Sequence, residues 1–324
     1  MNRLKSYRDL EGLTQAELGK VLNLSPQMVS AIESGRRAYT GTLEAIGYSD
    51  ERFVVPTMSE PLHRQKMSTG IGVRNRAKEL VRLAGEVFAE LVQQTPKAPR
   101  LRIERVGELG PDADVDDVAG DVRAVIDHEA TGPIPNLTTA IERAGVCLIP
   151  LVGLPDISGL SSWVSDYPVI GLATGVPGDR FRFTLAHELG HLLLHTRGTE
   201  VAEGQANQFA GALLFPRPEF DDAMPEHPQL RDFVALKSSW GVSIASLIYR
   251  AHELDYIGDA RYRALQMQMS RWRRYEPGSF DAAHGTLLSR LVDVNGGVAK
   301  VSANLGVNHR HLADLVNWTH LRLA

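Results

Sequence analysis

Cysteine is almost absent from this chain, since Cys147 is the only one among its 324 residues. A single thiol excludes a disulfide within the chain and a zinc site built from several thiolates. Residues 146–149 form a short apolar run, so we expect Cys147 to be a buried strand residue rather than a reactive group. A metal or catalytic site must therefore use other side chains.

Long apolar runs and a strong net charge are lacking as well. No segment holds the roughly 20 consecutive apolar residues that cross a membrane, and the first residues lead into a polar helix. We therefore expect a cytoplasmic protein without a membrane partner. The net charge of −4 indicates no general attraction to nucleic acids. The length and the 43% hydrophobic content suffice for two or three domains.

The motif with the most chemical information is H-E-x-x-H at residues 187–191, inside a helical pattern over residues 181–194. In a helix, His187 and His191 lie one turn apart on one face, where both imidazoles can reach the same ion. Glu188 then projects beside the open coordination position. This arrangement is typical of zinc hydrolases. The alternative is a buried helix whose two histidines only pack.

A catalytic zinc needs a third protein ligand from a second element. Glu203 begins a segment with helical spacing and is followed one turn later by Asn207, so we expect Glu203 to be that ligand. Glu200 is the competing acid. His195 lies about 12 Å of helix rise from His187, too far to share one ion. We expect His195 and Asn207 to lie next to the ligands as supporting residues.

These segments resemble a known family. The stretches RFTLAHELGHLLLH from residue 182 and EGQANQFAGALLFP from residue 203 resemble the ImmA/IrrE family of intracellular metallopeptidases. The resemblance implies metal binding by His187, His191 and Glu203, with Glu188 as the general base. It also implies selective cleavage of a repressor or another DNA-binding partner. Gln205 departs from the pattern, because many relatives carry an acid just before the Ala-Asn pair.

The N-terminal residues have the pattern of two short helices. Residues 14–22 begin with a threonine cap, a turn follows at residues 23–24, and Ser25-Pro26 starts a second helix that runs to Glu33. The shared core is expected to consist of Ala16, Leu22, Val29 and Ile32. Two such helices joined by a tight turn form a helix-turn-helix.

The phrase LTQAELGKVLNLSPQMVSAIESGRR from residue 13 resembles the phage-repressor-like (XRE) DNA-binding family. In a helix-turn-helix the second helix enters the major groove with its N-terminus first. The residues expected near base edges are Gln27, Met28 and Ser30, and those expected near phosphates are Gln15, Arg36 and Arg37. Residues 39–53 are short for the remaining helices of that fold.

The local charge of this segment is small, because residues 1–37 carry six Lys/Arg against four acids. An excess of two positive charges supports only weak binding of DNA by a monomer. We therefore expect a homodimer or a second DNA-binding module. The alternative is a helix-turn-helix that binds protein.

Between these motifs, residues 54–72 are expected to be a linker. Residues 73–93 are expected to form a long amphipathic helix that dimerises or packs on the peptidase, with an apolar face made of Ala77, Leu80, Val81, Ala84, Val87, Phe88 and Leu91. Residues 104–129 hold nine acids against two arginines and are expected to be a solvated face. Strands are expected at residues 146–151, 157–164 and 168–173, flanking the metal helix. Residues 161–164 are the candidate edge for pairing with an extended substrate.

The C-terminal part contains two patterns with open interpretations. Residues 261–275 hold five arginines interleaved with Tyr262 and Trp272, which suit nucleic acid and a packed helix surface equally well. Residues 297–318 repeat the outline of a helix-turn-helix, with Gly306 at the turn and Asn308 as a cap. A plain helical hairpin has the same pattern.

Together these features predict an α+β, mostly helical protein with a zincin-like core. The expected segments are a helix-turn-helix domain (1–53), a linker with a long helix (54–99), a metallopeptidase domain (100–255) and a helical C-terminal domain (256–324). The expected cofactor is zinc, with Mn²⁺ or another divalent ion as the alternative.

We expect a regulatory endopeptidase that acts on a repressor or toxin encoded nearby, in a stress, phage or toxin-antitoxin context. One competing hypothesis is a DNA-binding regulator or antitoxin whose peptidase-like domain binds or senses a partner. The other is a metal site with a structural role alone.

Overall fold

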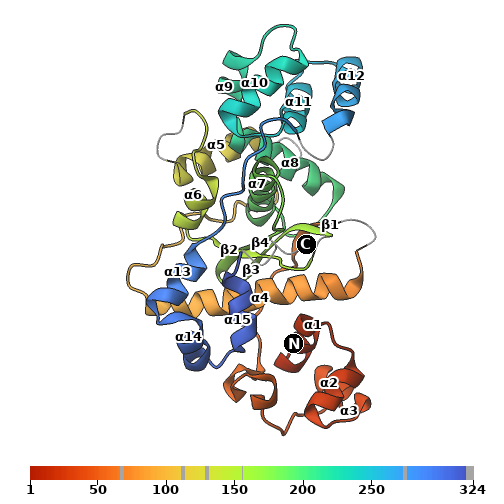
Figure 1. Cartoon of the computed structure of the whole chain (residues 1–324), viewed down its shortest axis with the longest axis vertical. Helices are drawn as coiled ribbons and strands as arrows, with labels where there is room; N and C mark the ends of the chain where they lie inside the picture. Colours follow the sequence, from red (N-terminus) through yellow and green to blue (C-terminus); the bar gives the residue numbers. More distant parts are fainter. Residues whose placement is uncertain (66–68, 111–113, 128–130, 155, 273–275, 319–324) are drawn as a thin grey trace. The chain divides into compact units, whose positions relative to one another are not determined.

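The computed structural model describes the chain except for residues 66–68, 111–113, 128–130, 155, 273–275 and 319–324. It forms two compact units, and neither is continuous in sequence (Figure 1). The first consists of residues 1–99, 146–174 and 285–324, and the second of residues 100–145 and 175–284. This grouping differs from the four consecutive segments expected from the sequence, because the sheet and the C-terminal helices pack with the N-terminal residues.

The predicted α+β class is confirmed. The first unit holds α1 (Arg3–Glu11), α2 (Gln15–Leu22), α3 (Pro26–Glu33), η1 (Glu44–Ile46), η2 (Asp50–Phe53), β1 (Leu62–Gln65), α4 (Ile71–Gln94), β2 (Cys147–Pro150), β3 (Ile157–Val164), β4 (Tyr167–Leu172), α13 (Leu287–Val294), α14 (Gly297–Leu305) and α15 (His309–Val316). The second holds α5 (Val115–Ile126), α6 (Leu137–Arg143), α7 (Gly178–Leu194), α8 (Glu200–Leu214), α9 (Arg217–Ala223), α10 (Leu230–Trp240), α11 (Ile244–Glu253), α12 (Asp259–Met269) and η3 (Ser270–Trp272).

The sheet of the first unit has four strands in the order β1-β3-β4-β2. The strands β1 and β4 pair antiparallel with β3, and β2 pairs parallel with β4. The expectation that residues 161–164 form an edge is therefore wrong. Ser161 pairs with Leu62 on one side and with Ile170 on the other, and Val164 bridges Met58. Cys147 is fully buried on β2, as expected.

The segment after the N-terminal helices is part of this sheet rather than a free linker. The backbone NH of Ser59 donates to Trp163 O at 2.9 Å, and the NH of Ser165 donates to Thr57 O at 2.9 Å. These bonds and β1 fix much of residues 57–65 along β3. Pro and Gly residues in this segment indicate breaks in secondary structure. They do not indicate that the segment pairs with a strand about 100 residues later.

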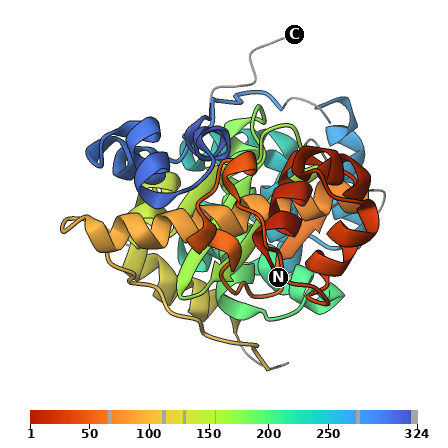
Figure 2. The same ribbon diagram turned by 90° about the horizontal axis from the view of Figure 1, so that it is seen from below.

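The helix α4 covers the sheet within the first unit (Figures 1 and 2). All seven apolar residues predicted for its inner face are buried: Ala77, Leu80, Val81, Ala84, Val87, Phe88 and Leu91. Gly85 permits the close approach to β3, because a Cβ there would overlap the side chain of Val164. The apolar face of α4 is thus used inside the chain, against the sheet and α1.

The helix-turn-helix at the N-terminus is present as predicted. Thr14 and Glu17 form a capping box at the start of α2, and Ser25 caps α3 with Pro26 in its first turn. One core residue was predicted wrongly, because Ala16 is exposed while Leu18 is fully buried. Ala16 lies two residues before Leu18, about 200° around the helix, and so faces the opposite side.

The second unit is helical in its described residues. Its acidic helix α5 was expected to be a solvated face, and Asp121 is exposed. Asp116 corrects that expectation, because it pairs with Arg250, whose side chain is buried. On α12 the packed-surface interpretation is favoured, since Arg261 donates to Pro228 O at 2.9 Å and the ring of Tyr262 lies 4.5 Å from that of His252. Residues 273–275 of the arginine-rich segment lie outside the described residues.

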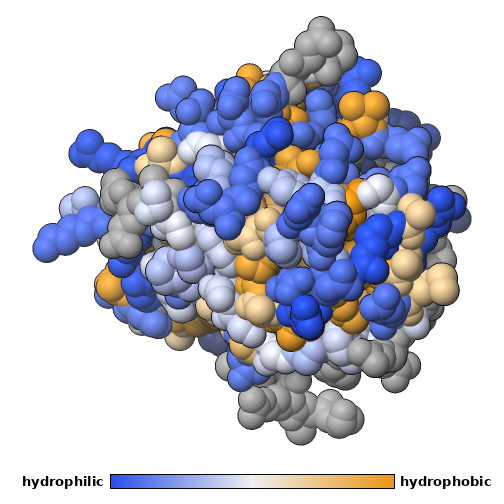
Figure 3. Space-filling view, turned by 90° about the horizontal axis from the view of Figure 1, so that it is seen from above, coloured by the Kyte–Doolittle hydropathy of each residue, from blue (hydrophilic) through white to orange (hydrophobic). Residues whose placement is uncertain are grey.

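No described helix is both long and apolar enough to cross a membrane. The face drawn in Figure 3 carries mostly hydrophilic side chains, with small apolar patches scattered among them. Single exposed apolar residues of this kind are normal on a folded protein and need no partner.

Candidate metal centre and DNA-binding helix

The helix α7 carries the H-E-x-x-H motif in a fully buried position. His187, Glu188 and His191 each have an exposed fraction of 0%. Gly190 allows α8 to approach closely, because a Cβ there would lie 2.9 Å from Cδ1 of Phe209. The two histidine rings lie 4.6 Å apart at an angle of 84°, on the same side of the helix. Their burial requires polar partners for both rings.

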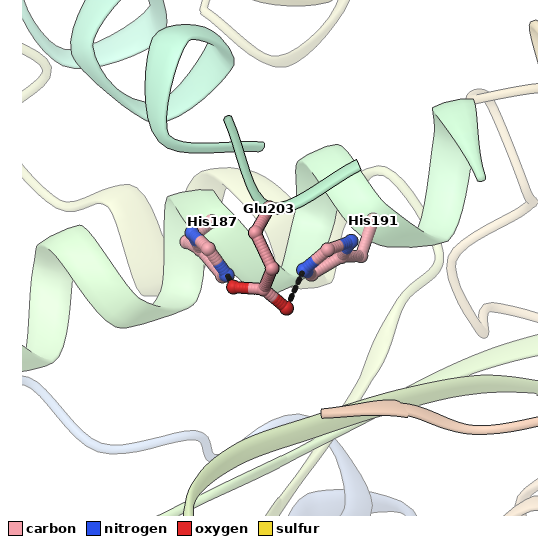
Figure 4. Close-up of side chains that lie close together, drawn as sticks. All are labelled: His187, His191 and Glu203. Carbon is pink, nitrogen blue, oxygen red and sulfur yellow. Dashed lines mark ion pairs between the residues drawn. The ribbon is translucent and has the colours of Figure 1, made fainter. Parts of the chain in front are cut away.

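Glu203 completes the cluster from the first turn of α8, which Thr199 caps. Its Oε2 lies 3.6 Å from Nε2 of His187 and its Oε1 lies 3.3 Å from Nε2 of His191 (Figure 4). The potential ligand atoms of these three residues lie within 4.8 Å of one another. The competing acid Glu200 is exposed and does not belong to this cluster.

The other nitrogen of each histidine has a separate partner. Nδ1 of His187 lies 3.0 Å from Oδ1 of Asn207, an oxygen that can only accept. Nδ1 of His191 lies 3.0 Å from Nδ1 of His195, whose Nε2 lies 3.1 Å from Oε1 of Gln205. His195 is also the residue at which α7 ends. The two expected supporting residues thus lie where they can orient the histidines.

These contacts define one consistent set of ring protonation states. If Nε2 of His191 holds a metal ion, its Nδ1 carries hydrogen and must donate. His195 then accepts on Nδ1 and donates from Nε2 to Gln205. Such a ring must be neutral, and burial lowers the pKa of His195 in agreement with this requirement. The sequence marked Gln205 only as a departure from the family pattern, because its contact with His195 depends on how α8 packs against α7.

The residues fit a divalent metal ion. Donors bound to one zinc at about 2.0–2.1 Å in a tetrahedral arrangement lie roughly 3.3 Å apart, close to the two distances between the histidines and Glu203. Nε2 of His191 is buried and makes no hydrogen bond within the described residues. Two imidazoles and one carboxylate leave a fourth position open, which is the donor set of catalytic rather than structural zinc sites.

Comparison with known proteins agrees with this geometry. Residues 142–252 match the family model of the IrrE N-terminal-like domain, a peptidase family, and residues 4–43 match that of a helix-turn-helix. Residues 142–252 therefore resemble an IrrE-type peptidase domain. A search of curated proteins found no match for the chain. The resemblance inferred from the two sequence stretches is thereby confirmed, and the IrrE-type match implies a zincin-like core.

The matched helix-turn-helix presents the residues predicted to contact DNA near the start of α3. Gln27 is exposed, whereas Met28 and Ser30 are half-buried. Arg36 and Arg37 are exposed beyond the end of α3, as phosphate contacts require.

Gln15 differs from this group, because its amide is held inside the helix-turn-helix. Its Nε2 donates to Oε2 of Glu33 at 2.9 Å, and Glu33 also pairs with Arg8 at 2.6 Å. No local sequence pattern indicates this network, which joins α1, α2 and α3. Glu33 therefore fixes the orientation of a side chain predicted to lie near phosphate.

Proposed function

We propose that this protein is a regulatory zinc-dependent endopeptidase that cleaves a repressor, toxin or other DNA-binding protein encoded nearby. The observation that carries the proposal is the convergence of His187, His191 and Glu203 beside buried Glu188 within the IrrE-type domain. A regulatory context such as stress, phage induction or a toxin-antitoxin pair follows from the helix-turn-helix on the same chain. Because DNA and DNA-binding proteins are intracellular, we propose that it acts in the cytoplasm.

In the proposed mechanism, the two histidines and Glu203 would hold the metal ion. When bound, such an ion lowers the pKa of a water molecule and polarises a peptide carbonyl. Glu188 removes a proton from the attacking water and later passes it to the leaving amine. Asn207 and His195 keep the two imidazoles in the orientation that points Nε2 toward Glu203.

The helix-turn-helix would bring the peptidase to its site of action. Gln27, Met28 and Ser30 would read bases, while Arg36 and Arg37 would contact phosphates. The small positive charge of residues 1–37 favours binding as a homodimer, because two half-sites double the number of phosphate contacts.

The decisive experiment is co-expression with each product of a neighbouring gene. The wild type and Glu188→Gln are compared for the amount of intact partner. Loss of one partner with the wild type alone supports the endopeptidase. If no partner is lost in either case, or equally in both, the proposal fails.

A second candidate function is a DNA-binding regulator or antitoxin whose peptidase-like domain binds a partner without cleaving it. The capped helices of the helix-turn-helix support the DNA-binding part of this candidate. It predicts that Glu188→Gln regulates the neighbouring promoter as the wild type does.

A further inference from the structure

The N-terminal helix-turn-helix is too short to bury its own core. After α3, residues 39–53 add only the short helices η1 and η2. Segments of this length bury a smaller fraction of their surface than larger domains do and are marginally stable alone. Leu43, Ile46 and Tyr48 are buried in the same apolar cluster as residues of the C-terminal helices. The members at the turn between α14 and α15 and in α15 are Leu305, Val307, Leu312 and Leu315.

Hydrogen bonds to backbone oxygens join the two sides of this contact. The NH of Ser49 donates to Gly306 O at 2.9 Å. Nδ2 of Asn308 donates to Ile46 O at 2.9 Å, and Nε of Arg52 donates to Leu305 O at 2.7 Å. We name this contact, between residues 46–52 and residues 305–311, the terminal clamp. In Figure 1 the blue helices α14 and α15 lie next to the orange segment that holds η1 and η2.

A buried histidine adds side-chain bonds to the terminal clamp. His311 on α15 is 4% exposed. Its Nδ1 lies 2.7 Å from the hydroxyl of Tyr48, and its Nε2 lies 2.6 Å from Oε1 of Glu11, the last residue of α1. Arg310 pairs with the same carboxylate. Both ring nitrogens thus find their partners on the N-terminal side, and loss of either bond would leave a buried polar atom without a partner.

Two glycines with positive φ lie in the terminal clamp, one in each of its two segments. Gly47 has φ +75°, and a Cβ there would lie 2.7 Å from Nδ2 of Asn308. Gly306 has φ +60°, and a Cβ there would overlap the side chain of Ser49. The two segments therefore approach more closely than any other residue would permit.

We propose that the turn between α14 and α15 is a structural part of the DNA-binding domain, and that α1–α3 hold their DNA-binding arrangement only while it is docked. The interaction surface is residues 46–52 with Glu11, and its partner is this chain's own C-terminal turn. The DNA readout below rests on the proposed DNA-binding function, whereas the hydrogen-exchange readout does not.

The chain offers matched controls for a test in the full-length protein. Gly12 and Gly297 also have positive φ, at +67° and +84°, but a Cβ at either position meets no atom within 4 Å. Gly306→Ala is compared with Gly297→Ala by amide exchange in α1–α3, and Gly47→Ala is compared with Gly12→Ala by exchange in α14–α15. Both members of each pair have positive φ, and they differ in whether an added Cβ meets the other side of the terminal clamp.

We expect Gly306→Ala to speed exchange in α1–α3 at least about tenfold and to weaken binding to a promoter duplex by a similar factor. Gly47→Ala should do the same in α14–α15, while the two controls leave the opposite segment unchanged. Equal effects of Gly306→Ala and Gly297→Ala, or wild-type exchange in Gly306→Ala, would overturn the proposal.

Two further measurements keep these outcomes distinct. Unchanged exchange in α7 and α8 shows that the second unit remains folded in each variant. Should Gly306→Ala unfold entirely, Tyr48→Phe removes only one bond to His311 and should still speed exchange in α14–α15; no change there would refute the terminal clamp. If the wild type binds promoter and scrambled duplexes equally, the proposed DNA-binding function fails, and the exchange data alone decide on the terminal clamp.

Discussion

Two groups of different chemistry lie beside the histidines of α7 and would orient them at a metal site. Asn207 offers an amide oxygen to His187, whereas His195 offers a ring nitrogen to His191 and continues the chain of bonds to Gln205. A carboxylate at position 205 would favour a charged His195, which could no longer accept from His191. The uncharged Gln205 avoids this, so the departure from the family pattern is compatible with the site.

The metal ligands can be tested one at a time. His187→Ala, His191→Ala and Glu203→Ala should each lose the bound metal, because two remaining ligands form an incomplete site. Metal content per chain after dialysis gives the answer. Glu200→Ala is the control for Glu203→Ala, since Glu200 is an exposed acid of the same helix turn. Undiminished zinc in both histidine variants would refute the assignment.

His195→Ala should still bind one ion per chain at saturation, with an affinity about 10- to 100-fold lower because His191 loses its acceptor. A competition titration with a zinc chelator measures this change. An unchanged affinity would mean that His195 does not orient the ligand.

Glu188→Gln separates chemistry from metal binding. The amide keeps the shape of the side chain and loses the proton acceptor, so we expect normal metal content with cleavage slower by at least about 100-fold. The rate is followed with the partner identified by co-expression. Cleavage at the wild-type rate would remove Glu188 from the role of general base.

At the scale of elements, local spacing predicted helices well and strand pairing poorly. The seven buried residues of α4 and the start of α3 follow from helix periodicity and caps, which are local properties. Likewise the period of α7 brings His187 and His191 together, and Glu203 lies in the first turn of the next helix. Residues 161–164 were wrongly predicted to form an edge. Local spacing does not reveal the pairing of β1 with β3, because that pairing joins segments about 100 residues apart. The contact of His195 with Gln205 depends in the same way on packing between helices.

The start of α3 can be tested by its effect on sequence discrimination. Changing both Gln27 and Met28 to Ala should reduce the preference for the promoter over random DNA by roughly 1–3 kcal/mol per lost base contact. Arg36→Ala should instead weaken both duplexes alike, because a phosphate contact carries no sequence information. Titrations at one fixed salt concentration compare the variants. A uniform loss in the double variant would contradict base readout.

The terminal clamp should weaken in mild acid. Burial lowers the pKa of His311 below its ordinary value of about 6.5, despite the nearby Glu11 and Asp314, which raise it. As the pH falls below that value, the unfolded chain takes up the proton more readily than the folded one, so stability is lost. Above the ordinary pKa, the ring of His311 is neutral in both the folded and the unfolded state, so its contribution to the free energy of unfolding is constant.

Other charged groups at this contact act in different ranges. Arg310 lowers the pKa of His311 further, and the pKa of Glu11 is itself lowered by Arg310 and His311 despite its burial. The contribution of Glu11 is therefore present above its ordinary pKa and lost only in stronger acid. Burial raises the pKa values of Tyr7 and Tyr48, so these phenols stay neutral.

Urea unfolding of the wild type and of His311→Gln between pH 7.5 and 5.5 tests the role of His311. The free energy of unfolding should depend less on pH in the variant than in the wild type. Equal slopes would contradict the role of His311.

At the scale of the whole molecule, the order of segments along the chain does not give the two units. The domain boundaries at residues 54, 100 and 256 were predicted from motifs and local helix and linker patterns, which say nothing about which distant segments pack together. The sheet residues 146–174 join the first unit although the IrrE-type match runs through them from 142 to 252.

All three predicted metal ligands come from α7 and α8 of the second unit. Zinc should therefore slow amide exchange mainly in those helices, by up to about 100-fold at a free concentration 100 times Kd. Exchange in α1–α3 should change far less. Mass spectrometry with and without zinc resolves the two regions. An equal effect on both would contradict a site confined to the second unit.

The terminal clamp also has a consequence for the time course of synthesis. A ribosome completes η2 roughly 260 residues before it completes α15. At about 5–20 residues per second, α1–α3 wait on the order of 10–50 s for their partner. During that interval the newly made chain exposes the apolar residues that the C-terminal helices later cover. A nascent chain on its own messenger should thus remain unable to bind its promoter until α15 has been synthesised.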